Sequence, residues 1–230
     1  MQTIRLPGGE ITSQLAMGTS GIGLSTGRRG PLALLEAAFD VGIRHFDTAP
    51  PYGMGQAERC LGEFLAHHKN EVTITTKYGL QPPKTGPLKR VSLRFAKPLL
   101  AAAPGFKKGL RRASFASSGR DAGPDFTVET AQAALEKSLR ELKTERIQIW
   151  LLHEATAAGL GDEKLLRFME DSQRQGKIGA CGVGGAAWKM PEIYAARREY
   201  CPVIQCEWDA LEPENRYPGT FPIRFQVLRH

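Results

Sequence analysis

Short apolar runs alternate with segments of helical periodicity along most of the chain, and this alternation constrains the fold more than any other feature. The segments between the runs repeat apolar residues every three or four positions, as between Thr127, which can cap a helix, and Leu142. Strands that alternate with helices predict an α/β fold, in which helices cover a parallel sheet. Five runs have the apolar composition of buried parallel strands: residues 44–48, 72–78, 146–153, 178–183 and 203–207.

The start of the chain predicts a β-hairpin followed by a first strand. Residues 2–6 and 10–14 flank a Pro-Gly-Gly turn, and residues 15–19 form the next apolar run. Pro31 predicts the start of a helix that Gly42 ends. The same reasoning predicts three further helices, at residues 56–67, 163–175 and 190–198.

A basic insertion of about residues 80–125 interrupts the alternation. Residues 81–120 contain ten Lys or Arg residues and no Asp or Glu, so the net charge of +7 belongs to this segment. A loop this long inside a compact domain usually has a function. We expect a charged flap over the active face, in preference to a surface for nucleic acid.

Four polar residues stand where predicted strands end. Asp47, Lys77 and His153 lie near the carboxyl ends of three runs, and Tyr52 lies in a Pro- and Gly-rich loop beyond Asp47. Each residue alone has an ordinary structural explanation in packing, capping or surface solvation. Because the carboxyl ends of parallel barrel strands share one face, we expect the four side chains to converge there.

The stretch from Phe46 to Gly62, FDTAPPYGMGQAERCLG, resembles the aldo-keto reductase signature D-T-A-x-x-Y-G-x-G-x-x-E-x-x-L-G, including Glu58. Asp47, Tyr52, Lys77 and His153 resemble the Asp-Tyr-Lys-His tetrad of that superfamily. The resemblance covers about residues 12–208 outside the insertion. It is closest to the branch of aldose and galactose dehydrogenases.

The residue types of this tetrad suit carbonyl reduction. A phenol has a pKa of about 10, and a neighbouring ammonium lowers it, so we expect Lys77 to activate Tyr52 as general acid/base. Asp47 would hold Lys77 through a charge-assisted hydrogen bond, and His153 would orient the substrate carbonyl. The hydride must come from a nicotinamide, because no side chain supplies one.

The resemblance also implies a cofactor site for NADP(H), with NAD(H) as the other candidate, and no metal. Gln205 would bind the nicotinamide carboxamide, Trp208 would stack on the ring, and Thr19 would face the cofactor from the end of the first strand. Gly184 and Gly185 stand where the family commonly has Ser-Asn. Only backbone amides can replace those side chains here.

The resemblance implies a (β/α)8 barrel of TIM type, in one domain spanning residues 1–230. Such a barrel needs eight strands and typically ~250 residues. The chain supplies six strand–helix steps up to Glu207, and residues 221–228 are the candidate for a seventh strand, although Pro222 suits an interior strand poorly. We therefore predict a barrel that is incomplete at its C-terminus, with residues 209–230 as a tail and the hairpin closing its bottom.

We expect an NAD(P)-dependent oxidoreductase that interconverts an aldehyde, ketone or sugar hemiacetal with the corresponding alcohol or lactone. The alternative is a catalytically defective relative retained for binding, which the missing eighth strand and Gly184-Gly185 favour. A third hypothesis is a binder of anionic polymers that uses the basic insertion.

Composition points to a cytoplasmic protein. The start of the chain lacks the pattern of a signal peptide, and no stretch approaches the ~18 apolar residues of a membrane span. We expect a small carbonyl or sugar partner, with neither membrane nor nucleic acid, and the sequence leaves the oligomeric state open. Four cysteines show no disulfide or metal-site spacing: Cys60, Cys181, Cys201 and Cys206.

Overall fold

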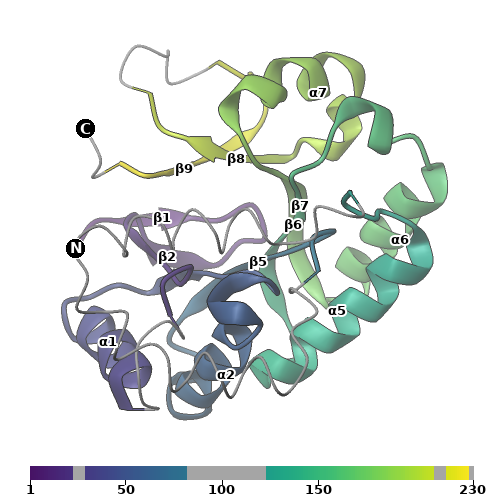
Figure 1. The fold of residues 1–230 in the computed structure, drawn as a ribbon. Helices are drawn as coiled ribbons and strands as arrows, with labels where there is room; N and C mark the ends of the chain where they lie inside the picture. Colours follow the sequence, from purple (N-terminus) through teal and green to yellow (C-terminus); the bar gives the residue numbers. More distant parts are fainter. Residues whose placement is uncertain (23–28, 82–122, 210–215, 228–230) are drawn as a thin grey trace, which may run out of the picture.

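Seven parallel strands form a curled half-barrel in the computed structural model, which describes residues 1–22, 29–81, 123–209 and 216–227 (Figure 1). They follow one another around the sheet in chain order, and a separate two-stranded hairpin joins β1 (Thr3–Arg5) to β2 (Ile11–Ser13). The strands of the curled sheet are β3 (Ala16–Gly18), β4 (His45–Asp47), β5 (Thr73–Tyr78), β6 (Ile147–His153), β7 (Ile178–Gly184), β8 (Val203–Glu207) and β9 (Phe221–Phe225).

Five α-helices follow one another around the outside of the curled sheet in the described part of the chain (Figure 1). Each predicted helix is present, and short 3-10 turns at residues 52–54, 157–159, 187–189 and 198–200 fill the connections. The α-helices are α1 (Arg29–Asp40), α2 (Ala57–His68), α5 (Val128–Leu142), α6 (Glu163–Arg174) and α7 (Met190–Ala196).

The predicted incomplete barrel is confirmed, and β9 is its seventh strand. β9 pairs with β8 in parallel, and Pro222 lies opposite Ile204. β9 has only one neighbouring strand in the described residues, so it is an edge strand, where a residue without an N–H is tolerated. Pro222 suits an interior strand poorly, and its position in an edge strand explains why the sheet accommodates it.

The signature residues Glu58 and Gly62 hold the helical layer to the sheet. Glu58 is buried on α2, and its Oε1 accepts hydrogen bonds from Thr76 on β5 and Ser138 on α5, both at 2.8 Å. A Cβ at Gly62 would lie 2.1 Å from the carbonyl oxygen of Glu141, so only glycine allows α2 and α5 to approach this closely. Part of the signature therefore encodes packing.

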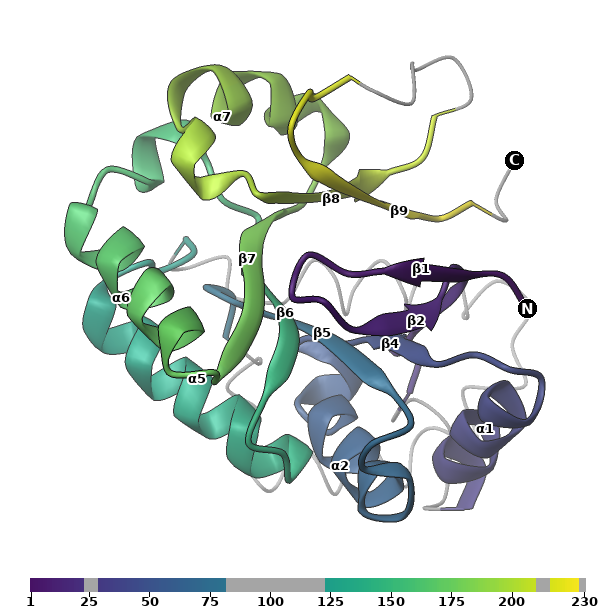
Figure 2. The ribbon, with the colours of Figure 1, turned by 180° about the vertical axis from the view of Figure 1, so that it is seen from behind.

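Two apolar clusters lie on opposite faces of the sheet. The larger fills the space between the sheet and the helices, with Phe46, Phe64 and Trp150 among its fully buried members. The smaller packs Leu6 of the hairpin connection against Leu151 and other strand residues on the concave face. Figure 2 shows the hairpin within the open side of the curled sheet. Glu10 of the hairpin pairs with Arg146, just before β6, so the hairpin contacts the N-terminal ends of the strands, which agrees with the prediction that it closes the bottom of the barrel.

A backbone hydrogen bond beside β5 joins the described residues on either side of the basic insertion. The N–H of Asp125 donates to the carbonyl of Gly79 at 3.2 Å, directly after β5. Residues 82–122 lie outside the described residues, as do 210–215 of the predicted tail, so the flap and the anionic-polymer surface stay predictions. Among the helices that are described, none has the length and apolar character needed to cross a membrane.

Candidate active site

The predicted tetrad comes together at the C-terminal ends of β4, β5 and β6. Asp47 ends β4, Lys77 is the penultimate residue of β5, and His153 ends β6. The same end of the sheet continues through β7 and β8. His153 lies opposite Gly184 on β7, and Gly184 lies opposite Gln205 on β8. Topology alone therefore gathers the side chains, as the sequence predicts.

Lys77 and Asp47 form a buried, bidentate ion pair. The Nζ of Lys77 lies 2.7 Å from Oδ1 and 2.8 Å from Oδ2 of Asp47, and it also donates to the carbonyl of Thr48 at 3.0 Å. Gln205 donates from Nε2 to Oδ2 of Asp47 at 2.7 Å. Since a buried ammonium needs a charged partner and satisfied hydrogen bonds, this arrangement fixes the position of Lys77.

Tyr52 lies between Lys77 and His153. The Nζ of Lys77 is 5.0 Å from the centroid of the Tyr52 ring, within the range of a cation–π contact. The rings of Tyr52 and His153 meet edge to face, with centroids 5.9 Å apart and planes at 85°. The ring of Tyr52 therefore contacts both an ammonium and an imidazole.

The loop that carries Tyr52 requires glycine at position 53. Gly53 has φ +58°, and a Cβ there would lie 2.1 Å from the carbonyl oxygen of Ile22. Gly55 also has a left-handed backbone, with φ +83°. Residues with side chains rarely adopt this conformation, so the glycines of the signature set the path of the loop and hold Tyr52 over the strand ends.

Burial outweighs the ammonium in setting the pKa of Tyr52. Burial raises this pKa, Lys77 lowers it, and the result lies above the ordinary value of 10.0. The predicted effect of Lys77 is present, but the predicted net lowering is wrong, because the phenolate is poorly solvated here. Burial also lowers the pKa of Lys77, but Asp47 and Tyr52 raise it, and the net pKa lies above its usual value.

His153 is a neutral imidazole at physiological pH. Burial, followed by the positive charges of Lys77 and Lys189, lowers its pKa to about 3. Its Nδ1 is buried and has no hydrogen-bond partner in the described part of the chain. A neutral imidazole carries one N–H and one acceptor nitrogen, so this ring can donate a hydrogen bond to an oxygen placed beside it.

Two of the expected cofactor residues lie at the end of β8. Gln205 is buried and tied to Asp47, so it belongs to the hydrogen-bond network of the ion pair. Trp208 is half-buried just beyond β8, and its backbone N–H donates to the carbonyl of Phe225 at 3.0 Å. This bond joins the segment after β8 to the edge strand β9.

The other expected cofactor residues lie at the ends of β3 and β7. The Oγ1 of Thr19 is buried without a hydrogen-bond partner among the described residues, and the Thr19 N–H donates to the carbonyl of Asp47 at 2.8 Å. Gly184 ends β7, and the N–H of Gly185 donates to the carbonyl of Gln205 at 3.0 Å. That amide is already engaged and does not offer a donor to a ligand.

Glu154 and Lys189 also lie at this face, and the sequence analysis missed them. Glu154 directly follows His153, has φ +58°, and lies with Oε2 2.8 Å from the Nζ of Lys189. A Cβ at Gly185 would lie 3.2 Å from Cδ of Glu154, so the glycine makes room for this carboxylate. The sequence signal that could have identified Glu154 is an acidic residue directly after the histidine at a strand end.

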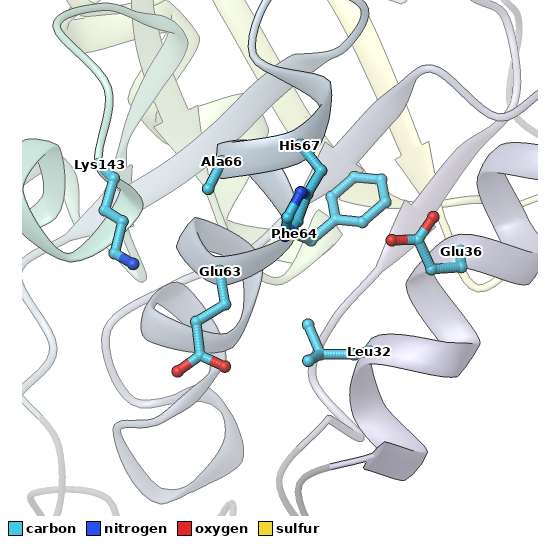
Figure 3. A pocket seen from close by; sticks show the side chains of 7 residues that line it. All are labelled: Leu32, Glu36, Glu63, Phe64, Ala66, His67 and Lys143. Carbon is cyan, nitrogen blue, oxygen red and sulfur yellow. The ribbon is translucent and has the colours of Figure 1, made fainter.

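A separate shallow groove of about 380 Å³ lies in the helical layer between α1 and α2 (Figure 3). Leu32 and Glu36 line it from α1, Glu63 and His67 from α2, and Lys143 from the end of α5. It lies away from the strand ends and has no part in the tetrad. Among the residues that the structure describes, no group of three His, Cys, Asp or Glu side chains could hold a metal ion.

Comparison with known proteins places this geometry in a family. The model of the aldo/keto reductase family matches residues 14–216. The D-threo-aldose 1-dehydrogenase of a Pseudomonas species is 32% identical over 162 residues, which cover 66% of this chain and 43% of that relative. The chain thus spans less than half the length of this curated relative.

Solved structures share the fold. The glycerol dehydrogenase of Gluconobacter oxydans has a TM-score of 0.61 at 26% identity, over 91% of this chain and 56% of that one. An aldo-keto reductase from Klebsiella pneumoniae in complex with NADPH has a TM-score of 0.59 at 20% identity, over 90% of this chain and 58% of that one. With the matching family model and the strand-end residues, these findings show that the chain belongs to the aldo/keto reductase family.

Proposed function

We propose that this chain is an NAD(P)-dependent oxidoreductase that interconverts an aldehyde, ketone or sugar hemiacetal with the corresponding alcohol or lactone. The observation that carries the proposal is the contact of Tyr52 with both Lys77 and His153, above the buried Lys77–Asp47 pair. An acid/base, a cation that stabilises its ionised form and a neutral donor then lie side by side. In carbonyl reduction such groups can deliver the proton to oxygen and stabilise the charge that develops there.

The unpartnered polar atoms of this face fit a polar cofactor. The Oγ1 atoms of Thr19 and Thr48 and the Nδ1 of His153 are buried without hydrogen-bond partners in the described residues. Buried polar groups are rarely left in this state unless a ligand or water completes them. In the proposed site Thr19, Gln205 and Trp208 would hold the nicotinamide end of NADP(H), with Gly184 beside Gln205 and Gly185 beside the Glu154 carboxylate.

A nicotinamide bound here would supply or accept the hydride, and the side chains of this chain would transfer the proton. In reduction Tyr52 donates its phenolic proton to the carbonyl oxygen, and in oxidation it takes the proton back. Lys77 stabilises the phenolate that reduction leaves behind, and Asp47 holds Lys77 in place. His153, neutral at pH 7, donates a hydrogen bond that orients the carbonyl oxygen.

The names of the relatives support the substrate class and cofactor that we propose. The Pseudomonas relative is named for an aldose, and the Klebsiella structure holds NADPH. We therefore propose a small carbonyl compound or sugar as substrate, and NADP(H) as cofactor with NAD(H) as the alternative. The cytoplasmic setting that the sequence suggests is a separate proposal.

Titration of the purified chain with NADPH and NADH, followed by nicotinamide fluorescence, tests the proposal. We expect saturable binding at micromolar concentration, followed by turnover with aldehydes or sugars. Binding of neither dinucleotide to a folded sample would contradict the proposal. The matched control is Glu163→Gln, on the exposed surface of α6, which should bind like the unaltered chain.

The second candidate function is binding without catalysis. Two observations favour it: the sheet has free edges at β3 and β9 in the described residues, and the Gly185 amide is already engaged. This candidate predicts saturable dinucleotide binding that is never followed by oxidation or reduction of any carbonyl substrate. The same titration followed by a turnover assay separates the two functions.

A further inference from the structure

Trp188 is an exposed aromatic residue beside the proposed active site. Its side chain is 77% exposed, more than any other large hydrophobic side chain in the described residues. It lies in the 3-10 turn Ala187–Lys189 that follows β7, on the face where the tetrad gathers. An indole combines a large apolar area with a single polar atom, which suits it to pack against a ligand that is apolar on one face and polar at its edge.

A pair of opposite charges connects Trp188 to His153. The Nζ of Lys189 lies 5.6 Å from the centroid of the Trp188 ring and 2.8 Å from Oε2 of Glu154, which directly follows His153. Both charged side chains are largely buried, so they are held in place. Their charges reach the tetrad, because Lys189 lowers the pKa of His153 and Glu154 contributes to the raised pKa of Tyr52.

The backbone of Glu154 supports a functional role for this pair. Glu154 has φ +58°, a left-handed conformation that a residue with a long side chain rarely adopts. Strained backbone of this kind concentrates at ligand sites, where the surrounding structure enforces it. Gly185 leaves the space that the carboxylate needs, since a Cβ there would lie 3.3 Å from Oε1 of Glu154.

The three side chains match the chemistry of a carbohydrate. A sugar presents a C–H face, which packs on an aromatic ring, and hydroxyl groups, which both donate and accept hydrogen bonds. A carboxylate accepts from hydroxyls and an ammonium donates to them, and these charge-assisted bonds are stronger than neutral ones. A simple alkyl aldehyde offers nothing to the charged pair.

We propose that Trp188, Lys189 and Glu154 form a subsite for the hydroxyl-bearing part of an aldose whose carbonyl carbon lies at Tyr52 and His153. The proposal rests on the proposed function and makes it specific, because the subsite prefers sugars over unsubstituted aldehydes. Trp188 stacks on the sugar, Glu154 binds its hydroxyls, and Lys189 holds Glu154 while donating to a hydroxyl.

The first test needs no turnover. Acrylamide quenching of tryptophan fluorescence is measured with increasing aldohexose, and separately with hexanal. Trp150 is fully buried and Trp208 half-buried, so Trp188 is the tryptophan most open to the quencher. We expect the aldohexose to protect the emission and hexanal to leave it unchanged, and Trp188→Phe should remove the protected component. Lack of protection by every aldohexose and aldopentose tested would overturn the subsite.

The second test compares KM values for an aldohexose and for hexanal. Trp188→Ala should raise the KM for the sugar about tenfold, the scale of one aromatic contact, with little change in kcat or in the KM for hexanal. Trp188→Phe should restore most of the loss, and Glu154→Gln should also raise the sugar KM selectively. The control Glu163→Gln should change neither KM.

The outcomes of these two tests distinguish a failure of the subsite proposal from a failure of the proposed function. Equal effects of Trp188→Ala on both substrates, or none on the sugar, would overturn the subsite while leaving the oxidoreductase proposal intact. Absence of turnover with every carbonyl would instead contradict the proposed function, and the quenching experiment would still report on sugar binding. If Trp188→Ala changes only the oligomeric state of the chain, Trp188 serves a protein interface and the inference is wrong.

Discussion

Two carboxylates eleven residues apart in the same signature, Glu58 buried and Asp47 partly buried, have different surroundings. Glu58 faces two hydroxyl groups in the helical layer, and burial raises its pKa despite those hydrogen bonds. Asp47 faces the ammonium of Lys77 at the strand ends. Both residues are carboxylates, but Asp47 is more exposed and its partner is an ammonium, and we expect these differences to decide which carboxylate serves packing and which serves chemistry.

Two buried histidines show the same difference. His45 contacts the hydroxyls of Thr73 and Thr75 through both ring nitrogens, at 2.7 and 2.8 Å. His153 keeps an unpartnered Nδ1 in the described structure. Both ring nitrogens of His45 are thus satisfied, while Nδ1 of His153 and the Oγ1 atoms of Thr19 and Thr48 at the strand-end face have no partner among the described residues. Unpartnered buried atoms also occur at Glu10, Tyr78, Trp150 and Tyr217, but the three at the strand ends lie beside the tetrad, where a ligand can complete them.

The largest effect on stability is expected from breaking the ion pair. Lys77→Met leaves the Asp47 carboxylate buried without its cation, and should lower the free energy of unfolding by about 3–5 kcal/mol in urea titrations. The double variant Asp47→Asn/Lys77→Met should recover much of that loss, because no uncompensated charge remains. Equal stability of Lys77→Met and the unaltered chain would mean that the pair is not buried as described.

The pH dependence of stability should report on His45. Burial lowers the pKa of His45 to about 4 from 6.5, so the unfolded chain binds a proton first as the pH falls. The free energy of unfolding should therefore fall between about pH 6.5 and pH 4, with roughly 3 kcal/mol from this residue. Above pH 6.5 this contribution is fully present.

Urea unfolding of His45→Gln between pH 7 and pH 4 checks this expectation. The variant should lose roughly half of the pH dependence, because His153, whose pKa burial lowers to about 3, contributes a similar amount over the same range. His67→Gln, on the exposed surface of α2, is the matched control and should retain the full dependence. Identical pH profiles for His45→Gln and the control would contradict the described burial.

The smallest effect is expected from the packing carboxylate. Glu58→Gln keeps an acceptor oxygen for Thr76 and Ser138, so the free energy of unfolding should fall by only about 1 kcal/mol. The turnover of the folded fraction should stay unchanged, because Glu58 touches the helical layer and not the tetrad. A large loss of turnover in folded Glu58→Gln would remove the distinction between the two carboxylates.

The sequence was sufficient for the strand order and for the convergence of the tetrad, because both follow from strand periodicity and from parallel topology. The net pKa shift of Tyr52 was predicted wrongly. The neighbouring charge is visible in the residue pattern, but the desolvation that outweighs it depends on how the loop packs on Ile22. The contact of Glu154 with Lys189 was missed because it joins residues 35 positions apart through the left-handed backbone at Glu154.

The role of Tyr52 is the central claim, and a comparison of Tyr52→Phe with the unaltered chain tests it most directly. NADPH affinity and single-turnover rate with a carbonyl substrate should be measured on the same samples. We predict that the rate falls by about 10²–10⁴-fold, the scale of general acid/base catalysis, while NADPH affinity stays nearly unchanged. A Tyr52→Phe variant that turns over at a comparable rate would show that the proton comes from another group.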